Sequence, residues 1–424
     1  MSELFNFKDK SFAVYGLGLT GKSVIKFLKK NKVKKTIIWD DHLFNLNIKL
    51  RKKFKDNLDL VDHIIISPGI NINNSILKKK LLKNKKKLLT DLDLFFLKNN
   101  LKRSIVITGT NGKSTTCSLI HHIFIKNKIK SQLAGNIGKP ILDIKFIKNE
   151  IYIIEASSFQ LENSKFVRPY CAAILNITKD HLDWHGTEKN YIKSKFKIFK
   201  NQKNSDFAFI NDTKLKKIFR KNKFLGKLNF IEKNPLKINQ IQNNYLKLQS
   251  NKDNIAFAFH ISKKFKIKKL NFLNSLKSFK GLNHRQELFL KIKNHIFIND
   301  SKATSFEATR YALKSNDNII WILGGKPKEN DKIRINKFKK KIIMAYIIGK
   351  HPNFFSKQIN KNIKYEIYKN LKIVIKKIFQ SLKYHKKTTI LFSPASASYD
   401  QFKNFVQRGE KFKKLIKYYA KKSF

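Results

Sequence analysis

The sequence predicts an α/β protein of three modules, each built on an open and mostly parallel sheet. Three observations support this prediction. Short apolar strands alternate with helical segments along the chain, glycine turns follow several strands, and polar clusters stand where strands end. In such sheets, ligands bind at the carboxyl ends of the strands. With 424 residues, the chain has room for roughly two to four domains.

The first module carries a glycine turn between a strand and a helix. Strands are predicted over residues 12–15, 36–39 and 63–67, with a helix over residues 22–30. The turn Gly16-Leu-Gly-Leu-Thr-Gly21 has the spacing of a dinucleotide fingerprint, and Asp40 follows the second strand, where an acid suits a ribose hydroxyl. This pattern predicts a Rossmann-like, doubly wound domain over residues 1–97. Because no hydride-transfer site follows, a uridine nucleotide fits it at least as well as a dinucleotide.

The second module opens with a phosphate-binding pattern. A strand over residues 105–107, a loop over 108–112 and an apolar helix over 114–125 follow one another. In this P-loop architecture, loop N–H groups and the positive end of the helix face one point, where polyphosphate fits. Lys113 would add a cation, and the Ser114 hydroxyl would hold Mg²⁺. The general pattern has glycine where Ile107 stands, so a glycine turn with a chance Lys-Ser pair is the alternative.

Further polar clusters follow the later strands of this module. Strands are predicted over residues 151–154 and 172–175, and a helix over residues 189–200. Glu155 ends the first strand, where a metal-binding acid sits beside a P-loop strand; its alternative role is a helix N-cap. His181 lies in the Asp180–Gly186 cluster, and its alternative role is a hydrogen-bonded loop histidine. Lys195 by itself reads as one more solvated lysine.

The rest of the module is less informative. Asn251 and Asn254 precede an apolar helix predicted over residues 255–265, and their i, i+3 spacing suits either nucleobase contact or capping. The segment Gly281-Leu-Asn-His-Arg285 reads as a hinge. These boundaries predict a P-loop ATPase-like domain over residues 98–282.

The third module again alternates strands with helices. Four strands are predicted, over residues 296–298, 319–323, 342–348 and 388–392, and the last helix follows Arg408-Gly409. Polar clusters end the strands. A second Rossmann-like domain is therefore predicted over residues 283–424.

The composition is strongly basic, with 91 Lys and Arg against 29 Asp and Glu and a formal charge of +62. Nucleic-acid binding is the first expectation from such a charge. However, the basic residues are spread along the whole chain, and Lys, Asn, Ile and Phe, which share A/T-rich codons, are enriched together. Codon bias explains the charge better, so we expect no nucleic-acid partner.

Other bulk features point to the cytoplasm. Cys117 and Cys171 stand in apolar segments, so buried thiols are expected. Residues 1–10 are polar rather than signal-like, and no apolar run approaches the ~20 residues of a membrane span. We expect a cytoplasmic monomer without a membrane partner.

Taken together, the motifs resemble the Mur ligase family, and most closely its D-glutamate-adding members. The motifs that carry the resemblance are Gly16–Gly21, Ser67-Pro-Gly69, Thr108–Thr115, Gly135–Gly138, Glu155–Glu162, Asp180–Asp183, His284-Arg285, Asn299–Thr304, Leu323–Gly325, Ser393–Phe405 and Arg408-Gly409. The segment Ser393–Phe405 is typical of the D-glutamate-adding branch. Two positions depart from the family pattern: Trp184 replaces an arginine, and Lys326-Pro-Lys328 is shifted.

The resemblance implies roles for single residues. The substrate UDP-N-acetylmuramoyl-L-alanine would be held by Leu19, Thr20, Asp40, Gly69 and Asn136. ATP would be held by Gly109, Thr110, Asn111, Gly112, Lys113, Ser114, Thr115, Asn251, Asn254, His284, Arg285, Asp300 and Lys302. One Mg²⁺ would be held by Ser114 and Glu155, and a second by His181 and Lys195, with Lys195 as an N-carbamate. D-Glutamate would be held by Thr304, Lys328, Ser398 and Phe405.

The implied reaction is an ATP-dependent amide ligation through an acyl phosphate, with Lys113, His181 and Lys195 as its catalytic residues. Two other functions are weighed against it. A sibling Mur ligase or a folylpolyglutamate synthetase would lack the segment Asp400–Phe405. A P-loop ATPase stimulated by nucleic acid is suggested only by the charge.

Overall fold

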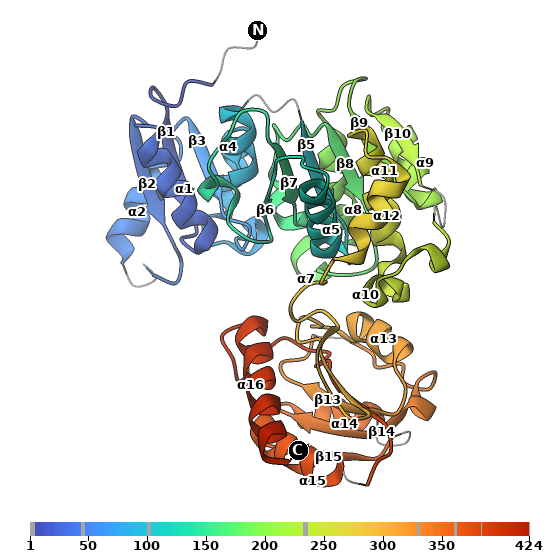
Figure 1. Ribbon diagram of the computed structural model, residues 1–424. Helices are drawn as coiled ribbons and strands as arrows, with labels where there is room; N and C mark the ends of the chain where they lie inside the picture. The colour runs from blue at the N-terminus through green and yellow to red at the C-terminus, as the bar shows by residue number, and fades with distance from the viewer. Residues whose placement is uncertain are drawn as a thin grey trace. The chain divides into compact units, whose positions relative to one another are not determined.

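The computed structural model describes residues 5–43, 47–99, 103–231, 236–328, 331–359, 363–382 and 384–423. By its internal contacts the chain divides into two compact units. The first comprises Met1–Lys247 with Asn251–Phe279, and the second comprises Leu248–Ser250 with Lys280–Phe424. The first unit contains two sheets and the second contains one (Figure 1). The boundaries of the three domains, at residues 97/98 and 282/283, stay predictions.

The amino-terminal sheet has the parallel order β2-β1-β3-β4. Its strands are β1 (Ser11–Tyr15), β2 (Lys35–Trp39), β3 (His63–Ile66) and β4 (Leu88–Leu89). Its helices are α1 (Leu19–Lys30), α2 (Ile48–Asn57), α3 (Lys78–Lys83) and α4 (Asp91–Lys98). The strands are short apolar runs with buried cores on both faces, as parallel strands require. The predicted βαβ pattern is confirmed.

The central sheet is also parallel, with the order β10-β9-β8-β5-β7-β6. Its strands are β5 (Ser104–Thr108), β6 (Ser131–Gly135), β7 (Ile151–Glu155), β8 (Cys171–Ile174), β9 (Phe207–Ile210) and β10 (Lys227–Phe230). Its helices are α5 (Lys113–Lys126), α6 (Ser158–Glu162), α7 (Leu182–His185), α8 (Glu188–Phe196), α9 (Thr213–Lys221), α10 (Asn244–Lys247), α11 (Lys252–Lys264) and α12 (Lys269–Lys277). The strand β5 lies in the middle, so the loop that follows it opens between β7 and β8.

One face of this sheet is covered by α5, α11 and α12, which lie side by side (Figure 1). Phe124 of α5 is fully buried there, and its ring centroid lies 4.9 Å from that of Phe265. Cys117 and Cys171 are free and buried in the same core, as predicted.

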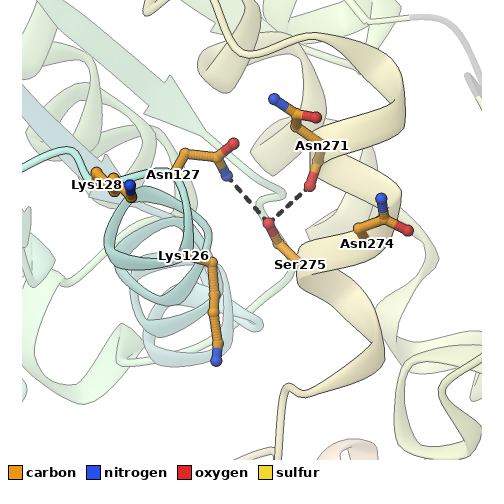
Figure 2. A pocket seen from close by; sticks show the side chains of 6 residues that line it. All are labelled: Lys126, Asn127, Lys128, Asn271, Asn274 and Ser275. Carbon is orange, nitrogen blue, oxygen red and sulfur yellow. Dashed lines mark hydrogen bonds between the residues drawn. The ribbon is translucent and has the colours of Figure 1, made fainter.

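The carboxyl end of α5 is joined to α12 by polar contacts. Asn127 donates hydrogen bonds to the Ile123 carbonyl at 2.7 Å and to Ser275 Oγ at 3.0 Å. Ser275 Oγ in turn donates to the Asn271 carbonyl at 2.7 Å (Figure 2). Asn127 thus caps α5 and fixes the position of α12, so the helix that follows the P-loop is held at both ends.

Two buried carboxylates at the start of α4 link the amino-terminal segment to the central one. Asp93 accepts hydrogen bonds from the backbone of Lys165 at 2.8 Å and of Phe166 at 2.7 Å. Asp91 accepts one from Gln160 Nε2 at 3.1 Å. Burial raises the pKa of Asp91 to about 6, against the lowering effect of Gln160.

The second unit has a six-stranded mixed sheet with the order β11-β12-β16-β13-β14-β15. Its strands are β11 (Glu287–Ile292), β12 (His295–Asn299), β13 (Ile319–Gly324), β14 (Ile342–Ile348), β15 (Tyr365–Tyr368) and β16 (Thr388–Phe392). Its helices are α13 (Phe306–Ser315), α14 (Pro352–Ile359), α15 (Leu371–Leu382) and α16 (Phe405–Ser423).

The four-strand prediction for this unit was therefore incomplete. It missed β15 and the edge strand β11, which pairs antiparallel with β12. Both alternate exposed and half-buried residues at a sheet edge, and their mixed composition gives only a weak strand signal.

Of the helices that the structure describes, none combines the length and apolar character needed to cross a bilayer.

We predict that Phe124→Ala lowers the free energy of unfolding by about 3 to 5 kcal/mol, because it removes a fully buried ring beside the P-loop helix. Its neighbour Ile125 is 52% exposed and provides the control. Ile125→Ala should leave the urea midpoint almost unchanged. Equal shifts for the two variants would contradict the packing described above.

We also predict a pH-dependent gain in stability for Asp91→Asn. The folded-state pKa of about 6 lies above the ordinary 3.8, so the stability contributed by this carboxyl falls as the pH rises through that interval. Between pH 5 and pH 8 the variant should gain about 1.4 kcal/mol relative to the wild type, measured by urea unfolding at each pH. The exposed carboxylate of Asp56 supplies the control variant Asp56→Asn, which should show little pH-dependent difference.

Candidate active site

The candidate active site of the first unit lies where β5, β7 and β8 end. The strand β5, the loop Gly109–Gly112 and the helix α5 succeed one another as predicted. Gly109 has φ +154° and Gly112 has φ +84°, a region that side chains disfavour. A Cβ at Gly112 would meet Asn254 Oδ1 at 2.3 Å. Glycine is therefore required at Gly112 by both its backbone conformation and its surroundings.

A residue that the sequence analysis did not single out braces this loop. Asn176 follows β8 and bonds the backbone of Asn111 twice: its Oδ1 accepts from Asn111 N at 2.9 Å, and its Nδ2 donates to the Asn111 carbonyl at 3.1 Å. The Asn176 carbonyl also accepts from Thr110 N at 2.9 Å. Its place at a strand end was the available signal, but an asparagine there is equally typical of an ordinary turn.

Two lysines meet at one carbonyl of the loop. Lys113 Nζ donates to the Gly109 carbonyl at 2.9 Å and to the Thr110 carbonyl at 3.0 Å. Lys195 Nζ, from α8, donates to the same Gly109 carbonyl at 2.9 Å. The structure thus brings together Lys113 and Lys195, which are far apart in the sequence.

Lys195 is among the most buried side chains of the protein, with 1% of its surface exposed. Burial, and next the charge of Lys113, lower its pKa well below the ordinary value, while Asp180 and Glu155 act in the opposite direction. The alternative of a solvated lysine is wrong here. Tyr191 lies one helical turn earlier on α8, with Lys195 Nζ 4.5 Å from its ring centre and its hydroxyl 3.0 Å from Thr110 Oγ1.

Glu155 is the last residue of β7 and is 2% exposed. Its Oε1 accepts a hydrogen bond from Asn136 Nδ2 at 3.0 Å, whereas its buried Oε2 has no hydrogen-bond partner among the described residues. The alternative role as a helix N-cap is wrong, because Ser157 caps α6. A buried carboxylate with a free oxygen beside a P-loop is suited to a cation.

His181 and its neighbours form the other wall of this site. His181 has φ +54°, directly before α7, and its Nε2 lies 3.5 Å from Asp180 Oδ2. Its ring centroid lies 4.7 Å from that of Phe159. Trp184, the departure from the family pattern, packs on the same Phe159 at 4.9 Å, and its carbonyl accepts from Asn71 Nδ2 at 3.0 Å. Trp184 therefore links the loop after β3 to the His181 segment.

The two asparagines of α11 face the P-loop. Asn254 Oδ1 accepts a hydrogen bond from Thr116 at 3.1 Å, and Asn254 Nδ2 donates to Asn251 Oδ1 at 3.0 Å. The helix begins at Lys252, earlier than predicted, and Asn251 occupies its N-cap without a side-chain capping bond. The capping alternative is therefore wrong for Asn251, and the pair instead supports the P-loop. Ser114 and Thr115, in the first turn of α5, are buried beside them.

The predicted uridine-nucleotide residues gather around the glycine turn of the amino-terminal sheet. Leu19 begins α1 and is 83% exposed, with Thr20 next to it. Asp40 accepts backbone hydrogen bonds from Leu17 at 2.6 Å and from His42 at 2.9 Å. Burial alone would raise the pKa of Asp40, but these backbone donors lower it on balance. Gly69 follows β3 at the same end of this sheet.

In the second unit, the predicted ATP residues gather at the ends of β12 and β16. Asp300 Oδ2 accepts from Ser393 Oγ at 2.7 Å, and burial raises the pKa of Asp300 to about 7. Lys302 N donates to the His284 carbonyl at 3.0 Å, and Lys302 Nζ lies 3.8 Å from the ring centre of Phe405. Arg285 follows His284, and its charge is one of the influences that lower the pKa of Asp300.

The predicted amino-acid residues lie on the neighbouring loops of this sheet. Lys326 pairs with Ala397 through two backbone hydrogen bonds of 2.9 Å, which places the segment of Lys328 beside Ser398. Arg408 of α16 is 1% exposed and donates to the carbonyls of Ser301 at 2.7 Å and Ser396 at 3.0 Å. Arg408 thereby ties together the loops that carry Thr304, Ser398 and Phe405.

The described part of the chain contains no group of three or more His, Cys, Asp or Glu residues placed to hold a metal ion by themselves. A divalent cation at Glu155 would therefore need the Ser114 hydroxyl and phosphate oxygens to complete its ligands. That combination is usual at P-loop sites.

Comparison with known proteins agrees with this geometry. The protein family described as "Mur ligase middle domain" matches this chain over residues 107–273. The UDP-N-acetylmuramoylalanine–D-glutamate ligase of Rickettsia prowazekii is 36% identical, covering 97% of this chain and 98% of its own length. The enzyme of the same name from the Wolbachia of Brugia malayi is 35% identical, covering 98% and 97%.

Solved structures share the fold. The UDP-N-acetylmuramate–alanine ligase of Thermotoga maritima matches with a TM-score of 0.60 at 16% identity, over 97% of this chain and all of its own. The MurF ligase of Thermotoga maritima, solved with ADP, matches with a TM-score of 0.60 at 14% identity over both full chains. The P-loop geometry, the three α/β sheets and the relatives above 30% identity over nearly full length lead to one conclusion: the chain belongs to the Mur ligase family, among its UDP-N-acetylmuramoylalanine–D-glutamate ligases.

Proposed function

We propose that this protein uses ATP to join D-glutamate to UDP-N-acetylmuramoyl-L-alanine in peptidoglycan precursor synthesis. The full-length similarity to ligases of that name supports the substrates, and the neighbour solved with ADP supports the nucleotide. The observation that carries the proposal is the convergence of Lys113, Lys195 and Glu155 at one sheet edge. We further propose that the protein acts in the cytoplasm, where ATP is available, and that it has no nucleic-acid partner.

The reaction proceeds in two steps. A carboxylate oxygen of the L-alanyl group attacks the γ-phosphorus of ATP, the bond to the ADP oxygen breaks, and an acyl phosphate forms. The amine of D-glutamate then attacks the acyl carbon, loses a proton, and inorganic phosphate leaves. Both steps bring anions together, so they need cations and aligned N–H donors at the transferred phosphoryl group.

The P-loop residues supply those groups. The N–H groups of Gly109 to Gly112 and the amino end of α5 bind the phosphates, and Lys113 neutralises the charge that develops during transfer. The bonds that Lys113 makes to its own loop carbonyls hold its ammonium at this place before nucleotide binds. Ser114 and Thr115 stand in the first turn of α5, next to the same phosphates.

Glu155, with its unpaired Oε2, and Ser114 fit a magnesium ion that accompanies ATP. His181 and Lys195, the latter as an N-carbamate, would hold a second ion. Magnesium at these positions supplies positive charge that offsets the phosphates. His181 lies beside Asp180, and Asn136 bonds Glu155. Asn136 would also lie along the alanyl tail of the substrate.

Lys195 would act as an N-carbamate. The lowered pKa leaves a neutral amine, which can attack CO₂; the nitrogen then loses a proton and the side chain becomes an anion. This change places an anion beside the Lys113 ammonium, where a protonated Lys195 would instead repel it. It also gives a hard oxygen ligand where a cation is needed.

The remaining residues position the substrates. Leu19, Thr20, Asp40 and Gly69 would bind the UDP moiety, and Asn251, Asn254, His284, Arg285, Asp300 and Lys302 would bind or support ATP. Thr304, Lys328, Ser398 and Phe405 would bind D-glutamate. We further propose that the protein acts as a monomer.

We predict that ADP release in the presence of UDP-N-acetylmuramoyl-L-alanine requires D-glutamate. Among a panel of D- and L-amino acids, glycine included, only D-glutamate should support turnover, and DNA or RNA should not stimulate ATP hydrolysis. Lys113→Ala should lower the rate at least about 10²-fold, because it removes a cation from the transferred phosphoryl group. Lys128→Ala, at the far end of the α5 region, should retain full activity and provides the control.

Turnover with meso-diaminopimelate or L-lysine instead of D-glutamate would indicate a sibling ligase. Stimulation by nucleic acid without D-glutamate would overturn the ligase proposal altogether.

We predict that Lys195→Arg is inactive while retaining the fold, because a guanidinium cannot form a carbamate. Lys195→Glu should keep more activity than Lys195→Arg, since it restores an anion, and added bicarbonate should raise the activity of the wild type only. Exposed Lys193 on the same helix gives the matched control Lys193→Arg, with unchanged activity. Equal activity of Lys195→Arg and the wild type would exclude a carbamate.

A further inference from the structure

A cavity of about 620 Å³ lies in the second unit, at the amino-terminal edge of its sheet. It is lined by Lys293, Asn294, His295, Phe379, Gln380, Leu382, His385, Lys386 and Ser423. The strands β12 and β16 begin at this edge, whereas the predicted nucleotide and amino-acid residues follow the opposite ends of the same strands. The cavity is therefore separate from the candidate active site.

Two buried polar groups beside the cavity, one of them in its lining, are not satisfied by the described part of the protein. His295 is 6% exposed, and its Nδ1 has no hydrogen-bond partner within the described residues. In the parallel register His295 is opposite Thr388, whose buried Oγ1 also lacks a partner within that part of the chain. Buried polar groups are usually hydrogen-bonded, so two unpaired ones beside the cavity favour a bound partner.

The charge around these groups is positive. Burial, and next the charges of His385 and Lys293, lower the pKa of His295. Lys293 is fixed close to His295 because it stands, with φ +49°, in the two-residue turn between β11 and β12. His385 and Lys386 also line the cavity, and none of the described lining residues is acidic. This charge distribution favours an anion.

The other walls suggest what the anion is attached to. Asn294 and Gln380 offer amide groups, while Phe379 and Leu382 form an apolar side. By contrast, the cavity between α5 and α12 has its Asn127 and Ser275 side chains bonded to each other (Figure 2). Of these two cavities, only the one at the amino-terminal edge of the second unit's sheet combines cations, unpaired buried polar atoms and an apolar wall.

We propose that this cavity binds the phosphate group of a small organic phosphate, held by Lys293, Lys386 and the imidazoles of His295 and His385. The amides and Phe379 would contact the organic part. Since the site lies at the opposite edge of the sheet from the substrate residues, the organic phosphate bound here takes no part in the ligation. The proposal does not depend on the proposed function.

The test follows the histidine imidazole signals of the full-length protein by ¹H–¹⁵N NMR, with His295→Gln and His385→Gln used to assign two of the 11 histidines. Inorganic phosphate and AMP are titrated, and adenosine, which lacks the phosphate, is the matched control ligand. We expect phosphate and AMP to shift the His295 and His385 signals until they saturate, with dissociation constants on the order of millimolar. Adenosine should leave both signals in place.

Lys293→Glu with Lys386→Glu should weaken this binding at least about tenfold without changing the ligase rate. Lys339→Glu with Lys340→Glu makes the same charge change at exposed lysines of the same unit and should leave binding intact. Signals that stay in place would show that no phosphate binds here and would overturn the proposal. Signals that move equally in both double variants would mean an adventitious ion only and would also overturn it.

Discussion

The candidate active site depends on two lysine side chains that share one backbone carbonyl. Lys113, which is half-buried, and Lys195, which is 1% exposed, both donate to the Gly109 oxygen. Burial, and next the charge of Lys113, disfavour a second ammonium at this place and lower the pKa of Lys195. The surrounding fold responds with the carboxylates of Glu155 and Asp180, which act on the pKa of Lys195 in the stabilising direction. The charge of Lys113, together with the N–H groups of the loop, prepares this place for a polyanion.

The parallel topology explains why these groups meet. The strand β5 lies between β7 and β8, so the three segments that follow these strands emerge at one edge of the sheet. Helix α8 returns Lys195 to that edge, and α11 places Asn254 against the loop. The second unit repeats the logic at the ends of β12, β13 and β16, where Arg408 ties neighbouring loops together.

Much of this arrangement could be predicted from the sequence, because glycine turns and β-branched runs are local signals. The P-loop, the strand ending in Glu155 and the buried cysteines were predicted correctly in position. The brace formed by Asn176, the ring of Tyr191 and the edge strands β11 and β15 were missed. Their roles arise from residues distant in sequence, such as the contact of Asn176 with Asn111, and no single-sequence periodicity reports such contacts. The burial of Lys195 is of the same kind, since nothing local distinguishes it from the many exposed lysines.

The contact between Gly112 and Asn254 has an evolutionary consequence. The space that any side chain at residue 112 would occupy is already filled by the Asn254 amide, whose oxygen lies 2.3 Å from that point. Asn254 in turn bonds Thr116 and Asn251. A substitution at Gly112, Thr116, Asn251 or Asn254 therefore disturbs a contact with another of these four residues. We expect the four to be conserved together among related proteins, while the lysine-rich surface varies.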